Sequence, residues 1–528
     1  MLGHLELLAA VSMIRERWLA WALLLALPLT LGACAQLQPR GDLPMELATP
    51  IAAQNSTPLD RAFMALETSH PGQSAFRLLI DGTEAFVVRM QSARMAVRSL
   101  DVQTYIWHAD LTGKFLAHQL LESADRGVRV RLLVDDMDAR AKNAHFAAVS
   151  AHPNIEVRVF NPFASRNGTL RLVSEGARNF KRINRRMHNK TWIADNRLAI
   201  VGGRNLGDEY FGASDEVNFV DLDFGMVGPV VRDASASFDR YWNSPSAYPL
   251  EMLDPDAVDT EILKKVRDRL AAFARESVGS RYAQALREDP AVQRLQSGDW
   301  PVEWSSNYRF IADDPLKISM KKRDVHRAAV SAVLLPAMRD AHSALDVISP
   351  YFVPGDKGST GLVNTARAGS QVRILTNSLA ANDVSAVHGG YSRYRKKLLK
   401  GGVQLWELKP LAGSTDKSLF GSSGASLHTK ALSIDQKTLF VGSYNLDPRS
   451  TWLNCEQGVL VESPALVTQF RAIFEAQTAG SHAWRVTREA GELRWADDQG
   501  VTSKEPQTTF GQRMQAWFAR VLRIDAQL

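Results

Sequence analysis

Cysteine is scarce in this chain of 528 residues, which contains two, Cys34 and Cys455. Cys34 ends an N-terminal apolar run, and Cys455 has no partner if the thiol of Cys34 is modified. We therefore expect no intramolecular disulfide, even in an oxidising compartment. Cys455 stands in an apolar stretch, residues 453–461. We predict that it is a small buried hydrophobic residue rather than a nucleophile.

The sequence also lacks the patterns of common cofactor sites. It contains no zinc-binding cluster, no nucleotide-binding glycine loop and no calcium-binding loop. Its formal net charge of +6 is modest for this length, so charge alone does not choose between anionic lipid and nucleic acid as a partner. We therefore expect chemistry without a cofactor or metal. The length is too great for one hydrophobic core and predicts about two domains.

The N-terminus carries the features of a secretory signal. Arg15 and Arg17 precede an uncharged apolar run, residues 18–33, that is short for a membrane-spanning helix. Its end, Leu-Gly-Ala before Cys34, resembles the lipobox of bacterial lipoproteins. The resemblance implies that residues 1–34 are a lipoprotein signal peptide and that Cys34 is lipidated. The rest of the chain would then face the periplasm from a membrane of the cell envelope. An uncleaved N-terminal anchor is the alternative.

A duplicated motif is the most informative feature of the chain. The pattern His-x-Lys-x4-Asp occurs twice with the same spacing, as His188, Lys190 and Asp195 and again as His428, Lys430 and Asp435. Each copy is followed at the same distance by a small residue and an asparagine, which are Gly203 and Asn205 and then Ser443 and Asn445. Imidazole can attack or protonate a phosphate, and ammonium and amide groups can hold its oxygens. The repeat predicts a duplicated domain that handles phosphate.

These residues resemble the paired HKD motifs of the phospholipase D superfamily. The text around them, Val201-Gly-Gly-Arg-Asn-Leu-Gly-Asp-Glu-Tyr-Phe and Gly442-Ser-Tyr-Asn-Leu-Asp-Pro-Arg-Ser, is similar to bacterial cardiolipin synthases, especially the C type. The likeness runs from about Leu59 to the C-terminus. It implies an α/β fold of two phospholipase D-like halves, each a mixed β-sheet flanked by helices. A pseudo-twofold active site would lie between the halves.

The organisation of the chain agrees with two halves. In both, strand-like runs alternate with helical patterns, which indicates sheets covered by helices. We expect residues 35–58 to be a tether and residues 254–299 to be a helical insertion or bridge. The two phospholipase D-like domains are expected at residues 59–253 and 300–486, followed by a C-terminal extension at residues 487–528.

The resemblance also implies roles for the motif residues. His188 would be the nucleophile that forms a phosphoenzyme, and His428 the general acid that later acts as a base; the opposite order is the alternative. Asp195 and Asp435 would fix the strand and turn behind the site. The groups expected to hold or approach the phosphate oxygens are Lys190, Lys430, Asn205, Asn445, Gly203 and Ser443. If each motif lies on a strand, alternation places its histidine and lysine on one face.

A nucleophilic imidazole needs an acceptor for its other nitrogen. Glu456, after the second motif, fits this role, and Asp223 is its best counterpart in the first half. The first half contains an insertion of several residues here. Asp221 or Glu216 could therefore serve instead of Asp223.

The substrate class is indicated by basic and apolar residues before the first motif. Lys181, Arg182, Arg185 and Arg186 stand among apolar residues, a mixture that suits a mouth on anionic phospholipid; a solvated charged face is the alternative. His388 and Tyr391 lie in a segment that resembles a family segment near the acceptor site.

The resemblance implies a cardiolipin synthase. It would transfer a phosphatidyl group from phosphatidylethanolamine or phosphatidylglycerol to phosphatidylglycerol, through a phosphohistidine and without a cofactor. Its partners would be anionic and zwitterionic phospholipids at a membrane surface. Alternatives are a phospholipase D hydrolase, a secreted phosphodiesterase or nuclease of the same superfamily, and a non-catalytic lipid-binding lipoprotein. The mild net charge and the expected lipid anchor argue against nucleic acid as a partner.

Overall fold

The structure is a computed structural model. It describes residues 37, 39–48, 57–139, 146, 149–164, 175, 178–255, 259–325, 330–382, 384–410 and 425–522. The expected signal peptide and Cys34 lie outside these residues. No helix within them is long and apolar enough to cross a membrane.

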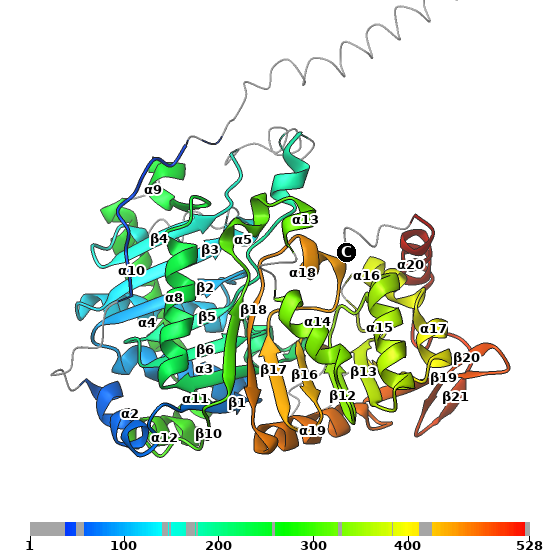
Figure 1. The fold of residues 1–528 in the computed structure, drawn as a ribbon. Helices are drawn as coiled ribbons and strands as arrows, with labels where there is room; N and C mark the ends of the chain where they lie inside the picture. The colour runs from blue at the N-terminus through cyan, green and yellow to red at the C-terminus, as the bar shows by residue number, and fades with distance from the viewer. Residues whose placement is uncertain are drawn as a thin grey trace, which may run out of the picture.

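The first half of the chain is built on a nine-stranded mixed sheet (Figure 1). Its strands, in spatial order, are β10 (Glu303–Ser305), β1 (Ser74–Leu79), β8 (Asp223–Val227), β6 (Leu198–Gly202), β5 (Thr191–Ala194), β2 (Ser99–Thr104), β3 (Arg129–Asp135), β4 (Ile155–Phe160) and β9 (Ala247–Pro249). β2, β3 and β4 are parallel, whereas their neighbours on both sides are antiparallel.

The second half repeats this plan in a ten-stranded sheet. Its order is β11 (Tyr308–Ala312), β18 (Gln457–Glu462), β17 (Thr438–Gly442), β16 (Ala431–Ile434), β12 (Ala344–Ile348), β13 (Gln371–Asn377), β14 (Gln404–Leu408), β19 (Ala483–Glu489), β20 (Glu492–Asp497) and β21 (Gly500–Thr502). β12, β13 and β14 are the parallel strands. The expected fold class, two α/β halves with mixed sheets, is confirmed.

One hydrophobic core belongs to both halves. It contains Phe76 and Val201 of the first half together with Leu439 and Val459 of the second, all of them buried. Helices α8 (Pro229–Trp242) and α19 (Pro464–Thr478) contribute to the same core. Because this core is shared, the two sheets hold one another in a fixed relative position. The same contact brings the two motifs to one junction.

The outer faces of the sheets are covered by separate sets of helices. The outer face of the first sheet is covered by α2 (Pro58–Ser69), α3 (Gly82–Met95), α4 (Leu111–Asp125), α10 (Thr260–Ser277), α11 (Arg281–Glu288) and α12 (Pro290–Ser297). The second carries α14 (Ser331–Arg339), α15 (Gly355–Arg367), α16 (Ser385–Ser392) and α17 (Arg395–Lys400). Side-chain caps fix several helix starts; Asp81 and Asp110, for example, accept backbone N–H groups of α3 and α4.

The domain limits expected from the sequence differ from the structure in the middle of the chain. Residues 254–299, expected as an insertion or bridge, form α10, α11 and α12, which pack on α3 and α4 of the first half. β10 then pairs with β1, so the first half extends to Ser305 rather than ending at residue 253. An amphipathic helix that follows a domain does not reveal in its sequence which sheet it will cover.

The two ends of the chain also differ from the expectation. Within the expected tether, residues 39–48 lie along the first half: the Ala48 N–H donates to Asp239 at 2.8 Å, and Arg158 contacts Glu46 at 2.5 Å. Within the expected C-terminal extension, the end of β19 together with β20 and β21 continues the second sheet, and α20 (Phe510–Leu522) packs on α16. Hydrogen bonds to distant residues, which local composition does not report, hold both segments.

Candidate active site

The two motifs lie immediately before two central strands. β5 begins one residue after Lys190, and β16 begins one residue after Lys430. The expectation that each His-x-Lys lies on a strand is therefore wrong by a few residues. The backbone of each motif histidine forms its hydrogen bond with the opposite half and not with a neighbouring strand of its own sheet. The His188 N–H donates to the carbonyl of Cys455 at 2.9 Å, and the Cys455 N–H donates to the carbonyl of Arg186 at 2.8 Å. Thus the first motif is joined to the second half.

The second motif is joined to the first half in the same way. β15 (Ala425–Leu427) pairs in parallel with β7 (Asn218–Val220), which forms a small sheet between the halves. The N–H of His428 then donates to the carbonyl of Val220 at 2.9 Å. In both halves the residue that accepts from the histidine N–H is followed directly by a carboxylate, Glu456 after Cys455 and Asp221 after Val220. The backbone exchange thus delivers one carboxylate to each histidine.

Each imidazole is held by a carboxylate of the opposite half. Nδ1 of His188 lies 2.9 Å from Oε2 of Glu456 and 3.1 Å from the carbonyl oxygen of Ser443. Nδ1 of His428 lies 2.6 Å from Oδ2 of Asp221. The ring nitrogen Nε2 of both histidines forms no hydrogen bond with any residue that the structure describes, so it is the nitrogen available to a substrate.

The tautomer of His188 follows from these contacts. A carbonyl oxygen accepts a hydrogen bond and cannot donate one, so the contact with Ser443 requires the hydrogen on Nδ1. In the neutral ring, Nε2 then carries the lone pair. The partner of His428 is a carboxyl group, which can accept or, when protonated, donate. The tautomer of His428 is therefore not restricted in this way.

The preferred expectation for the first-half carboxylate was Asp223, and the structure corrects it to Asp221. Asp223 is the first residue of β8 and binds Arg89 at 2.9 Å and Arg204 at 3.3 Å in a buried ion cluster. Asp221 precedes β8, in the link from β7, where the chain contacts the other half. Glu216, the second alternative, is exposed. The first half contains several inserted residues between its motif and this carboxylate. The distance from the motif along the chain therefore could not show which of the two aspartates corresponds to Glu456.

Gly203 and Ser443 contact these carboxylates. A Cβ on Gly203 would lie 2.1 Å from Oδ1 of Asp221, so only glycine leaves room for the aspartate. At the matching position the Ser443 hydroxyl donates to Glu456 Oε2 at 2.5 Å. The structure thus places both residues behind the histidines. Their expected contact with phosphate stays a prediction.

The two motif lysines are buried close to the histidines. Lys190 Nζ donates to the carbonyl of His188 at 2.6 Å, and Lys430 Nζ donates to the carbonyl of His428. Burial lowers the pKa of Lys190 well below its usual value; Glu456 opposes this effect, and the charge of Lys430 adds to it. Two buried cations that disfavour one another form a site in which an anion is stabilising.

The histidines are neutral at pH 7 in this arrangement. Burial lowers the pKa of His188 to about 4, although the charge of Glu456 raises it. Burial also lowers the pKa of His428 well below its usual value, and the charges of Lys430 and Lys190 lower it further. Burial raises the pKa of Glu456, but His188 and Lys190 outweigh burial and hold it below its usual range. Glu456 is therefore ionised at pH 7.

The two asparagines have different surroundings. Asn205 Nδ2 donates to the Tyr210 hydroxyl at 2.9 Å, and its Oδ1 accepts from the Ile106 N–H at 3.3 Å. Oδ1 of Asn445 is buried and has no hydrogen-bond partner among the described residues. Buried polar groups are rarely left unpaired, so the Asn445 oxygen is a position at which a bound group or water is expected.

Aromatic residues that the sequence analysis did not identify surround the imidazoles. Tyr105 stands edge-on to His188 with ring centres 5.2 Å apart, and Tyr210 has the same relation to His428 at 5.2 Å. Phe219 stacks on His428 at 5.3 Å. These rings limit the motion of the imidazoles. The signal available in the sequence was that Tyr105 follows the first strand of the parallel set, at the carboxyl end where ligand sites gather in α/β sheets.

Asp195 and Asp435 lie behind the site. Both adopt the left-handed backbone conformation, with φ near +53°. The carboxylate of Asp195 accepts from the N–H groups of Val97, Arg98 and Ser99. Asp435 does the same with the two residues before β12 and with Ala344, the first residue of that strand. This geometry fits the role expected of them, which is to fix the strand and turn.

The segment expected to form an acceptor site lies elsewhere in the second half. His388 and Tyr391 are buried on α16. His388 Nε2 lies 3.1 Å from Arg395 and 3.4 Å from Glu505, and Tyr391 packs on Phe352. Within the described part of the chain, neither His388 nor Tyr391 contacts a motif residue. His388 instead lines a cavity beside α20.

The basic segment before the first motif is largely used in structure. Arg186 is fully buried and binds Asp135 at 3.1 Å, and Arg185 donates to the carbonyl of Ile318 at 2.8 Å. Lys181 and Phe180 remain exposed. Most of the segment therefore supports the fold, and only its first part is available to a surface.

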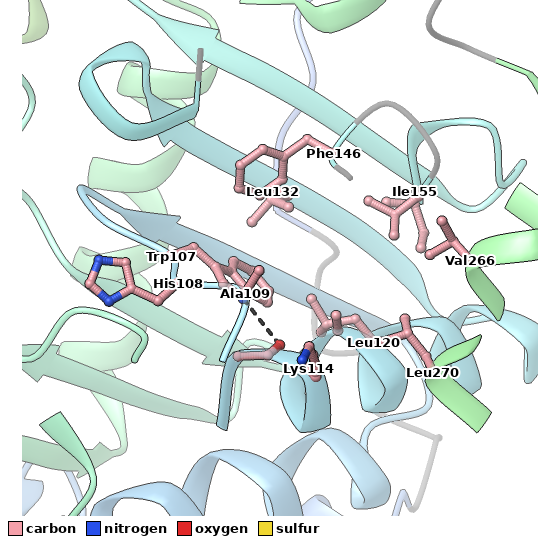
Figure 2. A pocket seen from close by; sticks show the side chains of 13 residues that line it. Trp107, His108, Ala109, Lys114, Leu120, Leu132, Phe146, Ile155, Val266 and Leu270 are labelled. Atoms are coloured by element: carbon pink, nitrogen blue, oxygen red, sulfur yellow. Dashed lines mark hydrogen bonds between the residues drawn. The ribbon is translucent and has the colours of Figure 1, made fainter. Parts of the chain in front are cut away.

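The first half also contains a small cavity and a cluster of three side chains that could bind a metal. A small apolar cavity of about 80 Å³ lies among Trp107, Leu120, Leu132, Phe146 and Leu270, with His108 turned away at one end (Figure 2). No motif residue lines it. His108, Asp110 and Glu209 form the one group of metal-binding side chains found in the described residues, but Asp110 already caps α4 and accepts the Asp208 N–H. We assign no metal to them.

The sequence is similar to a known protein family and to proteins of other bacteria. The family model described as "Cardiolipin synthase, PLD-like domain" matches residues 87–242 and 334–478, and each stretch contains one motif. Cardiolipin synthase C of Escherichia coli is 40% identical over 476 residues, which cover 88% of this chain and 99% of that protein. An uncharacterized protein of Helicobacter pylori is 32% identical over 88% of this chain and 92% of its own length.

A solved structure shows the same fold. The crystal structure of the phosphatidylserine synthase of Haemophilus influenzae aligns with a TM-score of 0.55 at 13% identity, covering 89% of this chain and all of that one. At this identity the likeness concerns the fold, including the presence of two halves.

Proposed function

Because the chain belongs to the cardiolipin synthase family of phospholipase D-like proteins, we propose that it is a phosphatidyltransferase that makes cardiolipin from two phospholipids. The observation that carries this proposal is the pair of buried histidines held at Nδ1 by carboxylates of opposite halves. The arrangement provides one nucleophile and one proton carrier, which phosphodiester transfer requires.

In the first step, Nε2 of His188 attacks the phosphorus of the donor lipid. The bond between phosphorus and the headgroup oxygen breaks, and His428 gives its Nε2 proton to that oxygen, which leaves as an alcohol. The product is a phosphatidyl group on His188. Two features support this order over the reverse: the Ser443 carbonyl directs the lone pair of His188 to Nε2, and Glu456 is ionised and stabilises the positive imidazole ring.

Binding of the substrate raises the pKa of His428, so that this histidine can carry the proton that it donates. In the absence of an anion, Lys430 and Lys190 lower the pKa of His428. A phosphodiester bound between these lysines offsets their charge, so the pKa of His428 rises when the substrate is present. The lysines also stabilise the charge that develops on the non-bridging oxygens in the transition state. The side-chain amide N–H groups of Asn445 and Asn205 complete this set as further donors to the same oxygens.

In the second step, a headgroup hydroxyl of phosphatidylglycerol attacks the phosphohistidine. His428 now takes the hydroxyl proton, the bond between phosphorus and His188 breaks, and cardiolipin leaves. Phosphatidylethanolamine or phosphatidylglycerol can serve as the donor in this scheme, releasing ethanolamine or glycerol. Hydrolysis would follow the same steps with water as the acceptor.

The proposed substrates are membrane lipids, so the enzyme must act at a membrane surface. The N-terminus could attach it there. We propose that Cys34 is lipidated after removal of residues 1–33 and that the catalytic halves face the periplasm. Several acyl chains on one cysteine hold a protein firmly, whereas a single chain binds weakly. Cys34→Ser should leave the halves folded and reduce cardiolipin formation in cells. Intact residues 18–33 in the parent protein isolated from cells, detected by mass spectrometry of its N-terminus, would contradict cleavage and indicate an uncleaved anchor.

The test of the activity uses the full chain with vesicles of phosphatidylglycerol, with and without phosphatidylethanolamine. Mass spectrometry should detect cardiolipin together with the released alcohol, and the His188→Ala and His428→Ala variants should form neither. Phosphatidic acid as the sole lipid product would identify a hydrolase and overturn the transferase proposal. Release of ethanolamine identifies phosphatidylethanolamine as a donor.

A further inference from the structure

Helix α20 presents an apolar stripe to solvent. Phe510, Trp517, Phe518, Val521 and Leu522 are exposed to 73%, 52%, 50%, 55% and 67%. With the half-buried Met514, they recur at intervals of three and four residues, so they share one face of the helix. Scattered single apolar residues are normal on a surface, but a contiguous set with two aromatic rings marks an interaction site.

The orientation of α20 is fixed by the opposite face. Ala516 and Ala519 are buried against α16. The approach is close at Gly389, where a Cβ would lie 2.4 Å from the carbonyl oxygen of Ala516 and 3.0 Å from the Cβ of Ala519. Only small residues permit this contact. The helix therefore cannot turn to bury Trp517 and Phe518 without losing its packing, and their exposure is built into the fold.

A basic cavity of about 660 Å³ lies beside the stripe. Trp517 forms part of its wall, and six cationic residues line it, which are Arg393, Arg395, Lys396, Lys504, Arg513 and Arg520. Its one acidic lining residue, Glu505, is bound by the buried guanidinium of Arg395 and lies 3.4 Å from His388. The cavity is therefore positive, and it opens next to aromatic side chains.

Hydrogen bonds connect this surface to the catalytic junction. Gln512 of α20 donates to the carbonyl of Leu379 at 3.5 Å, just beyond the end of β13. Asn377, the last residue of β13, donates to the carbonyl of Leu427 at 3.0 Å, and Leu427 directly precedes His428. In Figure 1, α20 and α16 lie in the upper part of the second half, at the same height as α18 (Pro448–Trp452), which follows the second motif.

We propose that α20 and the basic cavity beside it form a docking surface for an anionic phospholipid bilayer. The apolar stripe enters the boundary between headgroups and acyl chains, while the cavity holds the phosphate of an anionic headgroup. Aromatic and aliphatic residues on one face with arginines at its flank are the pattern of interfacial helices. This inference rests on the proposed function for the supply of lipid substrate. It adds a second lipid contact, separate from the histidines.

The proposal is tested by measuring whether a label on α20 enters the bilayer of a vesicle. Full-length protein with Cys34→Ser carries a single fluorescent label through Phe518→Cys, since Cys455 is buried and does not react. The matched control carries the label through Val501→Cys, which is 65% exposed on β21 at the far end of the second sheet (Figure 1). The probes are vesicles of phosphatidylcholine with and without phosphatidylglycerol. Iodide quenching then reports access of water to each label, independently of any contact that the N-terminal run makes.

We expect the label at position 518 to become several-fold less accessible to iodide with phosphatidylglycerol vesicles, and the label at 501 to stay accessible. Arg513→Glu combined with Arg520→Glu should remove the protection at 518. Equal quenching of the 518 label with and without vesicles would overturn the proposal, as would equal protection at 501. Protection by phosphatidylcholine alone would overturn its anionic part.

The activity separates this inference from the proposed function. Phe518→Ser should lower turnover of lipids in vesicles several-fold and leave turnover of short-chain soluble lipids unchanged, because the residue does not touch the reacting groups. Protection at 518 in a protein that makes no cardiolipin would contradict the proposed function alone. Cardiolipin synthesis by a protein with an unprotected 518 label would contradict the docking surface alone.

Discussion

Glu456 of the second half lies 2.9 Å from Nδ1 of His188 in the first half, and among the residues that the structure describes no carboxylate of the first half bonds to this nitrogen. The reciprocal contact joins Asp221 to His428. Each half therefore carries a histidine and a carboxylate that do not serve one another. The duplication is functional only as a pair, since neither half holds an oriented imidazole by itself.

Because Asp221 and not Asp223 holds His428, substitutions of these two aspartates should have different consequences. Asp221→Asn should lower kcat on the order of a hundredfold or more, because a carboxamide does not stabilise the protonated His428. Asp223→Asn should instead lower the free energy of unfolding by about 3–5 kcal/mol, because it leaves Arg89 and Arg204 buried without their counter-charge. Steady-state kinetics and thermal unfolding of both variants give the comparison. A catalytic loss with Asp223→Asn at unchanged stability would restore the original assignment of that residue.

Substitutions of the two histidines should differ when the leaving group is activated. His188→Ala should form no phosphoenzyme from any lipid. His428→Ala should still accumulate one from a short-chain lipid with a 4-nitrophenyl leaving group, because that group departs without a proton. Mass spectrometry of the digested variants locates the modified residue. Phosphohistidine at His428 in the parent protein would reverse the two roles.

The lysines should affect catalysis more than membrane binding. Lys190→Ala and Lys430→Ala should each lower kcat on the order of a hundredfold, as expected for donors directed at developing charge. Lys437→Ala is the control, since its side chain is 63% exposed in a surface ion pair with Glu462. Vesicle sedimentation should be the same for all three. A normal kcat with weakened sedimentation would show that the motif lysines are surface contacts.

A single methyl group at Gly203 should disable the second histidine. Gly203→Ala places a Cβ where Oδ1 of Asp221 lies, 2.1 Å away, so the carboxylate must move away from His428. Activity should fall about as much as with Asp221→Asn. Gly361→Ala on α15 is the matched control, since a Cβ there meets nothing within 4 Å, and it should raise stability by about 0.4–1 kcal/mol. Full activity of Gly203→Ala would refute the packing argument.

The lowered pKa of His188 predicts a loss of stability in acid. The folded protein binds a proton at His188 only near pH 4, whereas the unfolded chain does so near the ordinary value of about 6.5. Between these values the unfolded state holds more protons, so stability falls as the pH decreases. Relative to His188→Gln, the parent should lose up to about 3 kcal/mol between pH 6.5 and 4. Chemical denaturation across this range measures it, and parallel profiles for the two proteins would contradict the lowered pKa.

Several conclusions followed from the sequence because they depend on local pattern. The doubled His-x-Lys-x4-Asp spacing indicated the duplication and the chemistry, and alternating strands and helices indicated two α/β halves. Cys455 was predicted to be buried from its apolar neighbours, and the structure buries it fully. In each case the cause acts over a few residues along the chain.

The tertiary structure decided what depends on contacts between distant residues. The pairing of β7 with β15, two strands that are far apart in the chain, brings Asp221 to His428. The sequence analysis had preferred Asp223, with Asp221 and Glu216 as alternatives. Packing of α20 on Gly389 likewise determines that Trp517 and Phe518 face solvent. A residue's type states which interactions it can form. Only the folded arrangement of both halves determines which partner is within reach.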